Sequence, residues 1–117
     1  MLAGPAAAQS QSETLVQFVG FLGDLRLTVD DVRAELVGGE TDTPRVGIAM
    51  EAEPTAAFAL FTTTHVNQTV TFFVCGEQME SVSVSAPIDS GFALSDPMPL
   101  ARATAVVAAL NGEGNCP

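Results

Sequence analysis

The sequence predicts an α+β domain in which an antiparallel sheet has two helices packed on one face. Three observations support this fold class. Several short segments alternate between apolar and polar residues, which is typical of half-buried strands. Tight turns join these segments, and only two stretches have the apolar spacing of a helix. Short strands, tight turns and two helices together favour an antiparallel sheet with its helices on one side.

The first half of the chain contains three predicted strands. Residues 15–22 form an apolar run with β-branched and aromatic members, and Gly23 with Asp24 ends it. Residues 31–37 alternate between apolar and charged side chains, and residues 46–51 alternate between large apolar residues and small or charged ones. A period of two predicts a strand with one buried face.

Two helices are predicted, near residues 54–66 and 97–111. Pro54 suits the first turn of the first helix, because the N–H that proline lacks has no helical partner there. Asp96 followed by Pro97 is typical of the start of a helix, and apolar residues at helical spacing follow both starts. Residues 70–75 and 81–85 predict a hairpin between the two helices, and a short last strand follows it at 91–95.

One face of the sheet is predicted to be a neutral binding surface. If Val70, Phe72 and Val74 face the helices, the opposite face carries small or uncharged residues in a chain of charge −10. The predicted protein-binding residues on that face are Gly47, Ala49, Thr71, Phe73, Ser83 and Ser85. Contiguous neutral surfaces often dock a partner, so we expect a protein or a second copy of the chain to bind there. Ordinary solvent-facing serine and glycine residues are the alternative.

The composition argues against nucleic acid and membranes as partners. The chain has 117 residues, of which 47% are hydrophobic, and 14 acidic residues stand against four basic ones. A surface with this charge repels phosphate backbones and anionic lipid headgroups. No apolar run approaches the roughly 18 residues that span a bilayer, so insertion into a membrane is not expected.

The beginning of the chain predicts export to the periplasm or secretion. Ala6-Ala7-Ala8 before Gln9 resembles a signal-peptide cleavage site. Residues 1–14 are therefore interpreted as a signal-peptide remnant and disordered tail, and residues 15–117 as a single domain. A plain alanine-rich disordered tail is the alternative interpretation.

Two cysteines, Cys75 and Cys116, fit an exported protein with one disulfide. Two unrelated thiols are the alternative, with one of them buried and the other on a frayed tail. A zinc site is less favoured than either, because two cysteines and a single histidine cannot supply four ligands without carboxylates.

No catalytic apparatus, cofactor motif or metal site is predicted. His65 is the single imidazole and is expected at a surface or helix end, so its replacement by Ala should leave the stability nearly unchanged. A nucleophile pair with a neighbouring threonine would need a third orienting group and an oxyanion site. The pairs Asp30-Asp31 and Glu51/Glu53 lack the pattern of a calcium loop, and solvated acidic surface explains them better.

Six motifs follow one another along residues 25–112. They are an initial segment at 27–32, a strand at 46–48, a helix motif at 58–62, a hairpin at 75–79, a Pro-Ile-x-x-Gly turn at 87–91 and a last helix at 100–112. In this order they resemble the head subdomain in the first large periplasmic region of SecD, the accessory subunit of the bacterial Sec translocon. Cys75 replaces the Asp of the family's hairpin, Asn67 stands where the family has Gly, and Val82 stands where it often has Pro.

The resemblance implies a fold, a periplasmic location and contact with polypeptide. It does not imply a proton-driven motor, because the transmembrane helices with which SecD does that work have no counterpart in this sequence. The expected function is a free-standing exported domain, without enzymatic activity, that binds unfolded polypeptide or a protein partner. A secreted inhibitor, immunity-like or structural protein with a partner unrelated to export is the alternative.

Overall fold

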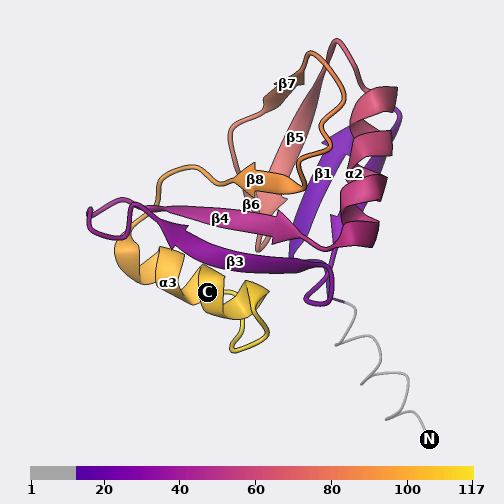
Figure 1. Cartoon of the computed structure of the whole chain (residues 1–117). Coiled ribbons are helices and arrows are strands. Elements are labelled where there is room, and N and C mark those ends of the chain that lie inside the picture. Colours follow the sequence, from indigo (N-terminus) through magenta and orange to yellow (C-terminus); the bar gives the residue numbers. More distant parts are fainter. Residues whose placement is uncertain (1–12) are drawn as a thin grey trace, which may run out of the picture.

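Two antiparallel sheets, rather than one, make up the fold (Figure 1). The structure is a computed structural model that describes residues 13–117. The part of the predicted signal remnant and tail that falls in residues 1–12 lies outside the described residues. Among the described residues, neither helix is long and apolar enough to cross a membrane.

The first sheet has five strands in the order β2-β1-β5-β6, with β7 also paired to β5. Its strands are β1 (Val16–Gly20), β2 (Gly23–Leu27), β5 (Gln68–Val74), β6 (Glu77–Gln78) and β7 (Val82–Val84). Every pairing in it is antiparallel. The predicted strand at 15–22 therefore turns back on itself and continues as β2, a strand that the sequence pattern did not indicate.

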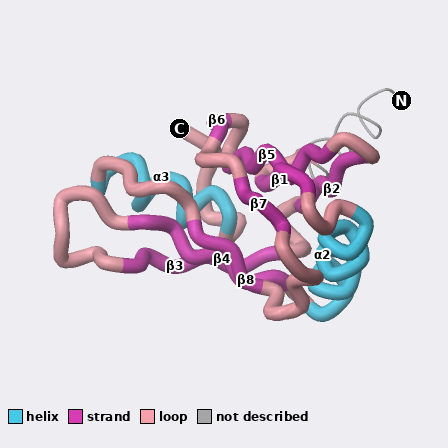
Figure 2. The backbone as a smooth tube through the Cα atoms, turned by 90° about the horizontal axis from the view of Figure 1, so that it is seen from above, coloured by secondary structure: helices cyan, strands magenta, loops and turns pink. Residues whose placement is uncertain are grey.

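The second sheet has three strands in the order β3-β4-β8. They are β3 (Val32–Val37), β4 (Arg45–Met50) and β8 (Phe92–Leu94). Helix α3 (Leu100–Leu110) packs against β3 and β4, whereas α2 (Ala52–Thr64) lies beside β2 and touches β4. The two helices lie at opposite sides of the molecule (Figures 1 and 2).

The α+β class, the antiparallel pairing and the two helices are confirmed, but the expectation of one sheet with both helices on one face is corrected. The division arises at the turn between β2 and β3. There the Asp31 carboxylate accepts hydrogen bonds from the N–H of Thr28, at 2.8 Å, and from its hydroxyl, at 3.2 Å. Because this turn leads the chain out of the first sheet, β3 pairs with β4 rather than with β2.

Both helices begin at residues other than those predicted. α2 starts at Ala52, which still leaves Pro54 in the first turn, where its missing N–H has no partner to lose. α3 starts three residues after Pro97, with Pro99 at its N-cap. Asp96 does not cap this helix, because its carboxylate accepts the backbone N–H of Glu80 at 2.9 Å.

One apolar core joins the two sheets. Ile48 and Val46 of the second sheet and Val16 of the first are all fully buried within the same cluster of side chains. The face of β5 that the sequence analysis assumed to point inward does so, since Val70, Phe72 and Val74 are each buried. This shared core places β7 and β8, which belong to different sheets, around one cavity.

Candidate functional site

The structure does not bring the predicted neutral face together on one surface. That face consists of Gly47, Ala49, Thr71, Phe73, Ser83 and Ser85. The first two lie on β4 in the three-stranded sheet, whereas Thr71 and Phe73 lie on β5 and Ser83 on β7 in the five-stranded one. Ser85 follows β7 and is exposed. A binding role for the predicted residues on β5 and β7, which are Thr71, Phe73 and Ser83, stays a prediction.

The half on β4 belongs to an exposed apolar surface. Gly47 pairs with Leu94, and Ala49 pairs with Phe92, so these residues share the face of the sheet that α3 does not cover. A Cβ on Gly47 would lie 3.0 Å from Val37 Cγ2 and 3.1 Å from Phe92 Cζ, so the absence of a side chain at Gly47 lets these two side chains lie close over β4. Phe92 is nevertheless 45% exposed and Leu94 40% exposed.

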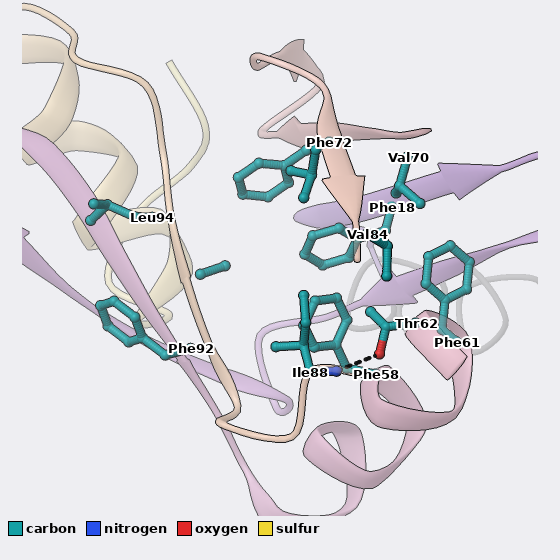
Figure 3. A pocket seen from close by; sticks show the side chains of 12 residues that line it. Phe18, Phe58, Phe61, Thr62, Val70, Phe72, Val84, Ile88, Phe92 and Leu94 are labelled. Atoms are coloured by element: carbon teal, nitrogen blue, oxygen red, sulfur yellow. Dashed lines mark hydrogen bonds between the residues drawn. The ribbon is translucent and has the colours of Figure 1, made fainter. Parts of the chain in front are cut away.

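An apolar cavity of about 200 Å³ opens between the two sheets (Figure 3). The rings of Phe18, Phe58 and Phe72 gather around it, and the centroid of Phe18 lies 4.7 Å from that of Phe58 and 4.8 Å from that of Phe72. Thr62 supplies a hydroxyl to the lining, but that hydroxyl accepts the Ile88 N–H at 2.9 Å and donates to a carbonyl of its own helix. Among residues 13–117, no charged side chain lines the cavity, so it suits an apolar group.

Two edge strands, β7 and β8, form opposite walls of this cavity. β7 contributes Val82 and Val84 and pairs with β5, whereas β8 contributes Ala93 with its neighbours and pairs with β4. Figure 3 shows the side chains of Phe92 and Leu94 on the far side of β8 from the cavity. The backbone of β8 therefore separates the cavity from the exposed apolar surface.

His65 is buried rather than at the surface, with a relative exposure of 1% for the whole residue. It is the C-cap residue of α2, as a helix-end position predicts, but its ring points inward. Nε2 accepts the N–H of Leu22 at 3.2 Å, so Nδ1 carries the proton and donates to the carbonyl of Phe61 at 2.8 Å. Both ring nitrogens are thus used to hold the β1–β2 turn against α2, and neither is presented for catalysis.

The acidic residues serve the surface and the turns. Asp31 holds the turn described above, and Glu51 forms an ion pair with Arg33 at 3.2 Å. A hydrogen bond from Arg26, with a second from a glutamine amide, lowers the pKa of the exposed Asp24 carboxyl. Within residues 13–117 no three histidine, cysteine or acidic side chains gather as a metal site.

The two cysteines form the predicted disulfide. Cys75 and Cys116 are bonded, with their Cα atoms 5.5 Å apart and a sequence separation of 41. Cys75 adopts a left-handed φ of 51° at the β5–β6 turn, and the tail after α3 reaches it there. Arg102 of α3 forms an ion pair with Glu77 of β6, so two links join this helix and its tail to the hairpin.

The sequence interpretation missed the cavity, although one signal of it was present. Residues 54–76 contain no Asp, Glu, Lys or Arg, and neither do residues 81–88. In a chain of charge −10, two uncharged stretches of this length indicate where apolar surface collects. They do not indicate that the stretches face each other, because that depends on the pairing of β7 with β5.

Comparison with known proteins identifies the fold. No protein-family model matches the chain, and no curated protein matches its sequence. One solved structure, described as that of a membrane component SecDF that enhances protein export, superposes with a TM-score of 0.67 over 100% of this chain and 71% of that one. The chain shares its fold with a part of SecDF.

The SecDF likeness is one of fold at low sequence identity. The first structure is 14% identical to this chain. A second, SecDF in a super-membrane-facing form, is 19% identical, with a TM-score of 0.63 over 78% of this chain and 12% of that one. The resemblance expected from the order of sequence motifs is therefore confirmed for the fold.

Proposed function

We propose that the chain is a non-enzymatic, export-associated domain that binds an extended segment of polypeptide. The observation that carries this proposal is the apolar cavity between the edges of β7 and β8. Its volume of about 200 Å³ is smaller than the several hundred Å³ typical of sites for drug-sized ligands. It matches one apolar side chain, and a polypeptide presents such side chains one at a time.

Two further observations support an exported location and a link to protein export. The Cys75–Cys116 disulfide suits an oxidising compartment such as the periplasm. The SecDF structure that superposes over the whole chain is described as enhancing protein export. The absence of catalysis in this proposal is supported by His65, because both nitrogens of its ring hold the fold and neither is free for proton transfer.

The test is binding of a labelled, unfolded peptide in which apolar and polar residues alternate. Ala93→Phe should fill the cavity from the β8 wall and weaken binding by about tenfold or more, because the cavity could then no longer admit a side chain of the peptide. Fluorescence anisotropy gives the affinity, and circular dichroism confirms that the variant is folded. Val82→Phe repeats the test from the β7 wall.

Ala101→Phe is the matched control, because it adds the same ring to an exposed position on α3. This variant should bind the peptide as tightly as the unchanged chain. Equal affinity of the cavity variants and the control would contradict the proposal, and so would a failure of the unchanged chain to bind any apolar peptide.

A further inference from the structure

The hydrogen bonds of β8 reveal which of its backbone groups face away from the sheet. The carbonyl of Gly91 accepts the N–H of Met50 at 2.8 Å, and the N–H of Ser95 donates to the carbonyl of Val46 at 3.0 Å. In an antiparallel pair such bonds recur at every second residue. Residues 91, 93 and 95 therefore direct their backbone groups toward β4, whereas Phe92 and Leu94 direct theirs to the opposite side.

That opposite side of β8 is an open edge. β8 pairs with β4 alone, and among residues 13–117 no hydrogen bond engages the backbone N–H or carbonyl of Phe92 or Leu94. At the other edge of the same sheet, a side chain engages the backbone of one residue of β3. Asn111 accepts the N–H of Ala34 at 2.8 Å and donates to its carbonyl at 3.0 Å, as a neighbouring strand would do.

We infer that the polypeptide binds by adding a strand to the open edge of β8, a mode of recognition that rests on the proposed function. Added strands gain affinity from backbone hydrogen bonds and specificity from alternate side chains. Here Phe92 and Leu94 offer two N–H donors and two carbonyl acceptors at the proper spacing for one added strand.

The two sides of β8 define the side chains that the added strand should carry. The residue opposite Ala93 points into the apolar cavity, because directly paired residues share a face of the sheet. Its two neighbours point to the other face, where they meet the exposed side chains of Phe92 and Leu94. The partner is therefore an extended segment of at least three residues, with one apolar side chain that fills the cavity and no proline at the bonding positions.

A substitution to proline on β8 distinguishes strand addition from binding of a side chain in the cavity alone. Leu94→Pro removes an N–H that points away from β4, so it breaks no bond of the protein's own sheet, and edge strands tolerate proline at such positions. Leu94→Ala is the matched control, because it removes the same apolar side chain but keeps the N–H. The proline variant should bind the alternating peptide on the order of tenfold more weakly than the alanine variant.

Peptides methylated at single backbone nitrogens give the second measurement, with the unchanged protein. Methylation should weaken binding on the order of tenfold at every second position and leave the positions between nearly unaffected, since an added strand turns alternate N–H groups toward its neighbour. Should Leu94→Pro fail to fold, this series decides the matter without it.

The outcomes separate the two proposals. Equal affinities of Leu94→Pro and Leu94→Ala, or equal effects of methylation at successive positions, would overturn strand addition while peptide binding itself stands. Absence of binding by the unchanged chain to every apolar peptide would overturn the proposed function.

Discussion

At the scale of single residues, His65 and Gly20 depend on each other. A Cβ on Gly20 would lie 2.3 Å from Nε2 of His65, so the absence of a side chain at Gly20 gives the imidazole its space. The imidazole in turn accepts the N–H of Leu22 in the β1–β2 turn, whose other residue, Phe21, is 89% exposed. The turn of two large apolar residues, Phe21 and Leu22, is thus stabilised by a hydrogen bond to a buried polar side chain.

Replacement of His65 by Ala should lower the free energy of unfolding by about 2–4 kcal/mol. The change removes a buried ring and leaves the N–H of Leu22 without its partner. Urea denaturation measures the loss. Thr63→Ala, at an exposed position on the same helix, should change the stability by less than about 0.5 kcal/mol.

The double variant tests the dependence directly. Gly20→Ala alone should cost about 1–3 kcal/mol through its clash with the imidazole, but much less when His65 is already Ala. The two effects should therefore be strongly non-additive. Simple addition of the two losses would show that the ring does not occupy the space at Gly20.

At the scale of elements, Asn111 takes the place of a fourth strand. It follows α3, and its amide pairs with both backbone groups of Ala34 on β3. Exposed strand edges promote unwanted pairing, and proteins commonly cover them. The contact also joins the end of α3 to the sheet on which that helix packs, so one side chain covers the edge at Ala34 and positions a helix.

Asn111→Ala should lower the free energy of unfolding by about 1–2 kcal/mol, because two hydrogen bonds are lost and the edge groups return to water. Asn115→Ala is the control, since Asn115 is exposed and its amide forms no hydrogen bond among the described residues. Chemical denaturation measures both variants. A loss at Asn115 equal to that at Asn111 would mean that the paired amide contributes nothing of its own.

At the scale of the whole molecule, two sheets are held together by a shared core and by a covalent link. The core passes continuously from Val16 in one sheet to Ile48 in the other. The Cys75–Cys116 disulfide and the Arg102–Glu77 ion pair join the C-terminal helix and its tail to the five-stranded sheet. The cavity between β7 and β8 depends on the relative position of the two sheets, so these links act on the proposed binding site as well as on stability.

Removal of the disulfide should lower the free energy of unfolding by roughly 4 kcal/mol, as the chain-entropy estimate gives for a loop of about 40 residues. The double variant Cys75→Ser/Cys116→Ser, compared with the oxidised chain by urea denaturation, measures the change. The unchanged chain, once its disulfide is reduced, should have the same free energy of unfolding as the double variant. Mass spectrometry that found two free thiols in protein purified from the periplasm would contradict the assignment.

The sequence by itself determined the α+β class, the alternation of β5 and the cysteine pairing, whereas the inward face of β5 was assumed. Each depends on local periodicity or on a count, since the alternation of Val70, Phe72 and Val74 needs no knowledge of distant residues and two cysteines allow a single intramolecular bond. The order of motifs along the chain also predicted the fold that a part of SecDF shares.

Only the tertiary structure decided the division into two sheets, the burial of His65 and the position of the cavity. These follow from contacts between residues far apart in sequence, such as Leu22 with His65 and Ala34 with Asn111. Residues on β4 and β5 share one alternating pattern whether or not their strands belong to one sheet, so periodicity could not separate Gly47 from Phe73. Strand pairing depends on contacts between distant residues, here on the turn at Asp31 and on the common core. The resulting pairing leaves β8 with β4 as its neighbour and with an open edge on its other side.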